Sequence, residues 1–151
     1  MTATHSLSDP VDILLVEDNP GDVRLTEEAF SEIATETTIT VATDGTEALD
    51  SLSAQFVDTA SSLPDLVLLD LNLPRMGGFE FLETVKNDPD FANIPVIVLT
   101  GSGAIEDVRE SYQKSANAYL TKPTDPDHFV SIARAVENFW FKQAALPPIC
   151  S

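Results

Sequence analysis

Five short runs of aliphatic residues recur along the chain, and each has the length and the β-branched or leucine-rich composition of a strand. The predicted strands span residues 11–16, 38–42, 65–70, 94–100 and 117–121. The third run, DLVLLD, is apolar at consecutive positions, which is typical of a central parallel strand covered on both faces.

The segments between these runs show helical periodicity instead. A first helix is predicted to begin at Asn19 and Pro20, because proline is favoured at the first helical position. Further helices are predicted after residues 44–45, around residues 81–85, over residues 105–112 and from about residue 125 to residue 141. The positions expected to face the core are Ile105, Val108 and Tyr112 in the fourth helix, and Phe129, Ile132, Ala133, Val136 and Trp140 in the fifth.

Strands that alternate with helices imply parallel pairing through right-handed crossovers. The chain is therefore predicted to form an α/β domain, a doubly wound parallel sheet with helices on both faces. Its 151 residues suit one domain over residues 11–141, with a flexible lead at 1–10 and a short tail at 142–151. In such sheets ligands bind beyond the carboxyl ends of the strands, so the residues just past each strand are the first candidates for a site.

Charge narrows the functions open to such a domain. The chain has 25 acidic and 8 basic residues, a net charge of −17, which argues against nucleic-acid or anionic-membrane binding through clustered lysine and arginine. No apolar run approaches the ~20 residues of a membrane span, and the first ten residues lack the pattern of a secretory signal. The single cysteine, Cys150, suits a reducing compartment, so a cytoplasmic protein is expected.

The acidity itself has two interpretations. An acidic surface aids solubility in any cell. The hypothesis we favour is a halophilic protein, because a salt-rich cytoplasm screens the repulsion among its carboxylates. A melting series in KCl separates the two: the halophilic hypothesis requires stability to rise with salt, and a flat or falling melting temperature contradicts it.

Polar and charged side chains stand at the carboxyl ends of four of the predicted strands or directly after them: Glu17 and Asp18, Asp70, Thr100, and Lys122. Some have an ordinary alternative explanation, since Asp18 could cap a helix and Asp70 could initiate a turn. Because the carboxyl ends of parallel strands share one edge of the sheet, three carboxylates would crowd into one crevice and repel one another unless a cation neutralises them. Carboxylates and water are ligands that Mg²⁺ prefers, so a Mg²⁺ site is predicted here.

Lys122 and Thr100 would add an ammonium and a hydroxyl, both of which can hold an anion. A metal, a carboxylate, a hydroxyl and an ammonium together indicate phosphoryl transfer to an aspartate. The chain lacks a GxxxxGK[ST] nucleotide loop, so we expect another protein to be the donor. We also predict a cis peptide bond between Lys122 and Pro123 that would turn the lysine inward.

The segments that hold these residues carry a resemblance to a known family. DILLVEDNPGDVRL, LLDLNLPRMGG, VIVLTGS and NAYLTKP occur in that order and resemble the receiver domain of response regulators in two-component signalling. The resemblance covers roughly residues 12–141 and implies the flavodoxin-like (βα)5 fold with strand order 2-1-3-4-5. It also implies a phospho-acceptor that assists its own phosphorylation and dephosphorylation and is not a conventional enzyme.

The resemblance assigns a role to each candidate residue. The implied roles are Asp70 as phosphoryl acceptor; Glu17, Asp18, Asp70 and the Asn72 carbonyl around Mg²⁺; Thr100 and Lys122 on the phosphoryl oxygens; and Tyr119 as the aromatic switch that follows Thr100.

A narrower resemblance concerns the partner. VEDNPGDVRL and the final Phe-Trp pair resemble the single-domain receivers that partner phytochrome-type histidine kinases. We therefore expect a stand-alone response regulator with a sensor histidine kinase as partner and no nucleic acid or membrane. Its output would be protein contact through the fourth helix, the fifth strand and the fifth helix, on which Val130 and Phe141 are predicted off the core face; a homodimer is one form of that contact.

Two alternatives stay open on the sequence. A degenerate receiver acting as a constitutive adaptor is disfavoured, because the acidic residues, the threonine and the lysine are all present. An Asp-nucleophile phosphatase of the haloacid-dehalogenase kind would carry a DxD signature on its first strand. In this chain the corresponding aspartate, Asp70, follows the third strand, and Asn72 stands where the second aspartate of the signature would be. Turnover of small phosphate esters would distinguish it.

Overall fold

The structure is a computed structural model that describes residues 10–58, 63–101, 105–123 and 125–144. The strands are β1 Val11–Val16, β2 Thr37–Ala42, β3 Leu66–Leu69, β4 Val96–Thr100 and β5 Ala118–Thr121. The helices are α1 Pro20–Ser31, α2 Gly45–Val57, α3 Gly78–Lys86, α4 Ile105–Gln113, α5 Pro126–Val136 and the π-helix η1 Glu137–Ala144. Of the predicted lead and tail, residues 1–9 and 145–151 lie outside the described residues. Within the described ranges, no helix is both long and apolar enough to cross a membrane.

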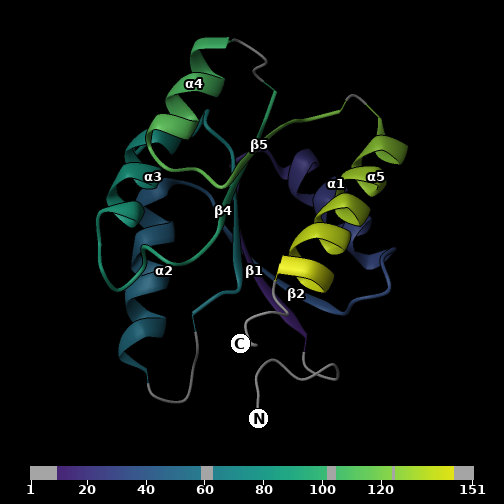
Figure 1. The fold of residues 1–151 in the computed structure, drawn as a ribbon, viewed down its shortest axis with the longest axis horizontal. Helices are drawn as coiled ribbons and strands as arrows, with labels where there is room; N and C mark the ends of the chain where they lie inside the picture. Colours follow the sequence, from purple (N-terminus) through teal and green to yellow (C-terminus); the bar gives the residue numbers. More distant parts are fainter. Residues whose placement is uncertain (1–9, 59–62, 102–104, 124, 145–151) are drawn as a thin grey trace.

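All strand pairs are parallel and the order across the sheet is β2-β1-β3-β4-β5, which confirms the predicted doubly wound α/β fold. Figure 1 shows α2, α3 and α4 on one side of the sheet and α1 and α5 on the other. The strand order reverses at β1, since β2 lies on one side of it and the later strands lie on the other. The space beyond the carboxyl ends of β1 and β3 is therefore the expected binding position.

Two apolar cores fill the space between the sheet and its helices. Side chains alternate along a strand, so Leu14 and Val16 of β1 join the core beneath α2 and α3, whereas Ile13 and Leu15 join the core beneath α1 and α5. β3 and β4 are buried at every position, as the unbroken apolar run of β3 predicts. Because a one-residue slip would invert every side chain, these cores fix which residues stand at the carboxyl edge.

The last helix differs from the prediction, because α5 gives way to the π-helix η1. At the junction, the buried Glu137 accepts hydrogen bonds from Thr35 N at 2.8 Å and Thr35 Oγ1 at 2.6 Å. The i→i+5 bonding of a π-helix changes the angular position of the residues that follow. Phe141 consequently packs against the core beneath α1 and α5, as does Val130, and the prediction that both lie off the core face is wrong. Phe139 is 56% exposed.

The α4 side of the sheet is covered less completely than the rest. Tyr112, predicted to face the core, is 52% exposed, and β5 is only half-buried at Ala118, Tyr119 and Leu120. An edge strand has a neighbour on one side only, which accounts for the partial burial of β5. This leaves apolar surface accessible between α4 and α5.

Candidate functional site

Three carboxylates meet at the carboxyl ends of β1 and β3. The sheet's hydrogen bonds continue up to them, from Glu17 N to Ala42 O at 2.9 Å and from Asp70 N to Val16 O at 3.0 Å. Glu17, Asp18 and Asp70 each offer an oxygen within 4.8 Å of the other two. Glu17 and Asp70 are buried, and Asp18 is exposed. The structure thus brings together the three carboxylates that the strand ends predicted.

Burial makes this cluster unfavourable without a cation. The pKa of Glu17 is raised to about 7, chiefly because burial removes water from its charged form; the hydrogen bond from Lys122 opposes this rise and the charge of Asp70 adds to it. A divalent cation would relieve the repulsion, and a compact set of carboxylate oxygens fits a hard ion such as Mg²⁺. Asp18, the exposed member, leaves one side of the cluster open to water, which Mg²⁺ usually retains.

Lys122 lies against the cluster, directly after β5. Its Nζ is 2.6 Å from Glu17 Oε1, 2.7 Å from Asp22 Oδ2 and 3.2 Å from Asp70 Oδ2. Burial by itself would lower the pKa of Lys122, but the hydrogen bonds and charges of these carboxylates outweigh it and raise the pKa above its ordinary value. The lysine is therefore a fixed positive charge within the site.

The predicted cis peptide bond between Lys122 and Pro123 is wrong, since no peptide bond among the described residues is cis. Lys122 N donates to Thr100 O at 2.7 Å, which continues the pairing of β5 with β4 by one residue. This backbone path already brings the side chain to the carboxylates, so no cis bend is needed.

Asp22 is a site residue that the sequence analysis does not single out. It stands in the first turn of α1, where Asn19 Oδ1 accepts hydrogen bonds from Gly21 N and Asp22 N. An acidic residue there is ordinarily explained by the helix dipole, so its position gave no signal of a contact with Lys122, 100 residues away. The contact forms because α1 packs against α5, the helix that follows Lys122 along the chain.

The predicted site residues Thr100 and Tyr119 lie on β4 and β5. Thr100 is fully buried, and its Oγ1 is the buried side-chain polar atom of the described residues that has no hydrogen-bond partner. An unpaired buried hydroxyl costs about 1–3 kcal/mol, so this group fits an acceptor that a ligand supplies. Tyr119 is half-buried, lies opposite Val98 of β4 and packs against the core beneath α2 and α3.

The loop from β3 to α3 is held against Asp70. The exposed Asn72 donates from its backbone N–H to Asp70 Oδ1 at 3.3 Å. At the start of α3, a Cβ on Gly78 would lie 2.6 Å from Leu71 Cα and 2.7 Å from Asp70 O. Only glycine permits so close an approach of two backbones. Gly78 therefore lets the start of α3 pack directly against the backbone of Asp70 and Leu71, a role that the sequence analysis missed.

An ion pair ties the same loop to the loop before α2. The buried Asp44 caps α2 by accepting from Glu47 N at 2.8 Å and also pairs with Arg75, whose φ of 56° is left-handed. The backbone hydrogen bond from Glu47 is the main cause that lowers the pKa of Asp44, and Arg75 lowers it further. Gly45 N donates to Met76 O at 3.2 Å. The loop that carries Asn72 is therefore anchored at a second point, which the sequence analysis also missed.

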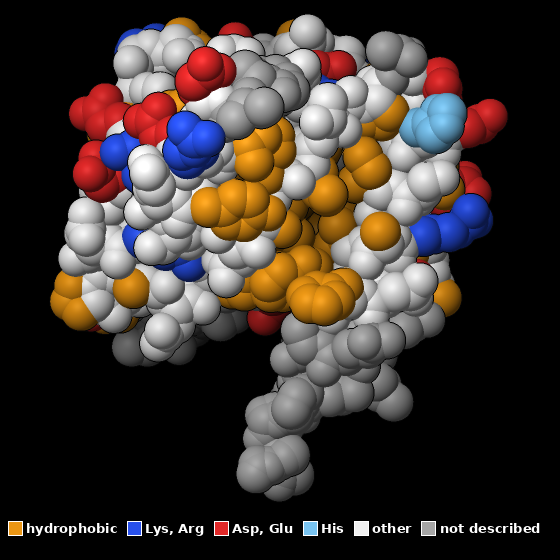
Figure 2. All heavy atoms as spheres, turned by 45° about the horizontal axis from the view of Figure 1, so that its top comes forward, with side chains coloured by type: hydrophobic (Ala, Val, Ile, Leu, Met, Phe, Trp, Pro, Cys, Tyr) orange, Lys and Arg blue, Asp and Glu red, His pale blue; other side chains and the backbone are white. Residues whose placement is uncertain are grey.

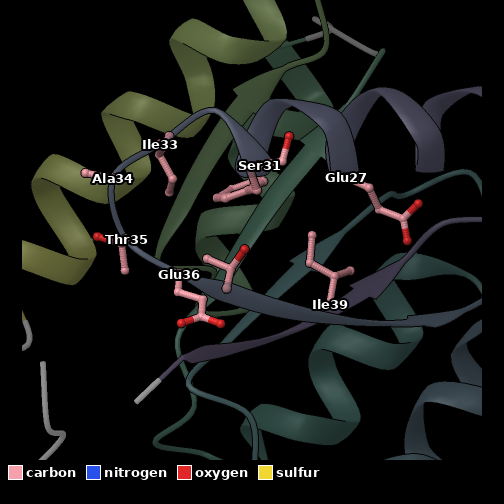
Figure 3. A pocket seen from close by; sticks show the side chains of 9 residues that line it. Glu27, Ser31, Ile33, Ala34, Thr35, Glu36 and Ile39 are labelled. Carbon is pink, nitrogen blue, oxygen red and sulfur yellow. The ribbon is translucent and has the colours of Figure 1, made fainter. Parts of the chain in front are cut away.

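A hollow of about 470 Å³ lies elsewhere, between the end of α1 and the start of β2. Figure 3 shows Glu27 on one side of it and Ile33, Ala34, Thr35 and Glu36 on the other, with Ile39 between Glu36 and Glu27. It adjoins the amino end of β2, whereas the acidic cluster of Glu17, Asp18 and Asp70 adjoins the carboxyl ends of β1 and β3. None of the predicted site residues lines this hollow, so it is separate from the candidate site.

Relatives of known identity share this fold. Residues 13–134 match the response regulator receiver domain family. Response regulator Rcp1 of Synechocystis sp. (strain ATCC 27184 / PCC 6803 / Kazusa) is 38% identical over 138 residues, which cover 91% of this chain and 94% of Rcp1. The phosphorylated cyanobacterial phytochrome response regulator RcpA superposes with a TM-score of 0.83 at 38% identity, over 92% of this chain and 99% of its own. The Mn²⁺-bound form of Rcp1 gives a TM-score of 0.80 at 38% identity, over 91% and 99%. The chain belongs to the response regulator receiver domains of two-component signalling.

Proposed function

We propose that the chain accepts a phosphoryl group on Asp70 from a sensor histidine kinase, within a receiver domain that spans residues 11–141. The observation that supports this most strongly is the buried Asp70 beside two further carboxylates and Lys122, at the point where the strand order reverses. In the transfer, a carboxylate oxygen of Asp70 bonds to phosphorus while the bond from phosphorus to an imidazole nitrogen of the kinase breaks. The electrons of that bond leave with the imidazole.

The acidic cluster would hold the Mg²⁺ ion that this chemistry uses. Its ligands would be Glu17, Asp18, Asp70 and the backbone carbonyl of Asn72. When bound, the ion offsets the charge of the carboxylates and of the phosphoryl oxygens. The closeness of the three carboxylates supports this assignment, and the related Rcp1 has been solved in a Mn²⁺-bound form.

Lys122 and Thr100 would donate hydrogen bonds to the phosphoryl oxygens. The buried hydroxyl of Thr100 would gain the acceptor that it lacks. A shift of Thr100 toward the phosphoryl group would leave room for Tyr119 to turn inward, which makes these two residues the switch. With these groups the chain assists its own phosphorylation and dephosphorylation, as a phospho-acceptor and not as a conventional enzyme.

Intact-mass measurement tests the acceptor directly. The wild-type chain is incubated with Mg²⁺ and acetyl phosphate in high-salt buffer, with Asp70→Asn as the control. A phosphoryl adduct on the wild type alone supports the proposal. An adduct on both proteins, or none on the wild type with both acetyl phosphate and a histidine kinase, contradicts it.

We further propose a phytochrome-type histidine kinase as the partner. The support is the likeness to RcpA, a phytochrome response regulator, over 92% of this chain. Phosphotransfer from a purified phytochrome kinase should be faster than from an unrelated kinase, and equal rates would contradict the proposed partner.

We extend the proposal to cytoplasmic localisation, because the single cysteine, Cys150, suits a reducing compartment.

The output surface would be the face formed by α4, β5 and α5. Figure 2 shows hydrophobic side chains gathered in a band down the middle of one face, between the α4 side and the α5 side. Tyr112 of α4 and Phe139 of η1 are both more than half exposed. Apolar surface of this kind favours association, and we propose a homodimer that forms through this face on phosphorylation. Light scattering with and without a beryllofluoride phosphoryl mimic tests it, and a monomer in both states contradicts it.

A further inference from the structure

Lys122 has three carboxylate partners, and one of them lies outside the acidic cluster. Asp22 does not belong to the set of carboxylates that could share a cation, which consists of Glu17, Asp18 and Asp70. Its oxygen nevertheless lies 2.7 Å from Lys122 Nζ, closer than the 3.2 Å that separates Lys122 from Asp70. Asp22 therefore contacts the site through its ion pair with Lys122.

The hydrogen-bonding capacity of the lysine is fully used in this arrangement. An ammonium has three N–H donors, and Glu17, Asp22 and Asp70 each lie within 3.2 Å of it. A phosphoryl oxygen on Asp70 can gain a hydrogen bond from Lys122 only if one of these partners loses its own hydrogen bond to the lysine.

Asp22 is the carboxylate that loses its ion pair with Lys122 at the lowest cost. Glu17 is buried and also accepts a hydrogen bond from Asn19 N at 3.2 Å. The Asp22 side chain is 27% exposed, against 3% for Glu17 and 7% for Asp70. Water can therefore replace the lysine at Asp22, whereas a buried carboxylate left without a partner is costly.

We propose that Asp22 is a positioning residue that holds Lys122 in the resting site and competes with the phosphoryl group for it, which slows the phosphorylation of Asp70. This inference rests on the proposed function. The lysine must leave Asp22 before it can donate a hydrogen bond to a phosphoryl oxygen, and the loss of this ion pair opposes the transfer.

The experiment compares phosphorylation rates of matched variants. Asp22→Asn removes the charge and keeps the shape, Asp22→Glu keeps the charge, and Glu27→Gln removes an exposed charge from the same helix without touching Lys122. Each protein is phosphorylated with acetyl phosphate over a range of Mg²⁺ concentrations and quenched for intact-mass measurement. Thermal unfolding in the same buffer checks the fold.

At saturating Mg²⁺, we expect Asp22→Asn to be phosphorylated about two- to five-fold faster than wild type, the range that a partly exposed ion pair allows. The half-saturating Mg²⁺ concentration should stay unchanged, because Asp22 is not a ligand. Asp22→Glu and Glu27→Gln should keep the wild-type rate.

Three results would overturn the inference: a rate for Asp22→Asn equal to or below that of wild type, the same acceleration in Glu27→Gln, or a change confined to the Mg²⁺ dependence. A slower Asp22→Asn with a lower melting temperature would show a merely structural residue. Absence of any adduct on the wild type would instead contradict the proposed function, so the two failures are distinguishable.

Discussion

Lys122 and Thr100, the two groups proposed to bind the phosphoryl oxygens, differ in whether they already have partners in the resting protein. Lys122 has three carboxylates within 3.2 Å, so its charge is neutralised before any ligand arrives. Thr100 Oγ1 is buried without a partner among the described residues, so its hydrogen-bonding capacity is unused. The lysine contributes to the stability of the resting fold, whereas the threonine detracts from it and is useful only once an acceptor arrives. Stability and function should therefore separate at these two positions.

Asp70→Asn has the largest expected effect, because it removes the carboxylate that we propose as the phosphoryl acceptor. Phosphorylation by acetyl phosphate should be abolished, since an amide oxygen is a far weaker nucleophile than a carboxylate. Intact-mass measurement checks this against the wild type. Residual phosphorylation at the wild-type rate would place the acceptor elsewhere and remove the basis of the comparison.

Lys122→Met should damage stability as well as function. It leaves the buried Glu17 and Asp70 without their cation, and breaking a buried ion pair costs about 3 kcal/mol or more. We expect the free energy of unfolding in the absence of divalent ions to fall by about 3 kcal/mol or more, and Mg²⁺ to restore part of the loss. Urea titrations with and without Mg²⁺ measure both values. Unchanged stability without Mg²⁺ would show that the lysine is not needed to hold the resting site together.

Gly78→Ala tests the close packing of α3 against the backbone of Asp70, the proposed acceptor. A Cβ at 2.6 Å from Leu71 Cα forces the backbone to shift, and we expect a loss of about 1–3 kcal/mol in unfolding free energy together with slower phosphorylation. Gly77→Ala is the matched control, because nothing lies within 4 Å of the Cβ that it would add. Equal effects of the two substitutions would contradict the close approach of α3 to Asp70.

Thr100→Val should have the smallest effect on stability and shows the contrast with Lys122→Met most clearly. Valine has nearly the shape of threonine and removes an unpaired buried hydroxyl, so the unfolding free energy should stay the same or rise by about 1 kcal/mol. Phosphorylation should nevertheless slow by about tenfold, because one donor to the transferring group is lost. Urea titration and phosphorylation rates on the same preparation check both. A clear loss of stability would mean that the hydroxyl is paired in the resting protein.

The sequence by itself determined the fold class and most of the candidate site. Alternating aliphatic runs and helical segments predict a doubly wound sheet, and the sheet that forms has the order β2-β1-β3-β4-β5. Because parallel strands end at one edge, residues that directly follow strands could be predicted as neighbours, and Glu17, Asp18 and Asp70 do lie together. Lys122 joins them for the same reason.

Tertiary structure decided the contacts that depend on how helices and loops pack. The sequence marks Asp22 as no more than a first-turn helix residue, and its contact with Lys122 exists only in the folded chain. The sequence likewise gives no sign that Gly78 lies against the backbone of Asp70 and Leu71. The π-helix η1 likewise departs from the α-helical periodicity of the sequence, at the point where Glu137 binds Thr35. The trans bond before Pro123 is the ordinary state of such a bond. The conformational propensity of a residue depends on its neighbours in the sequence. These contacts join residues that are far apart in the sequence, so only the folded arrangement determines them.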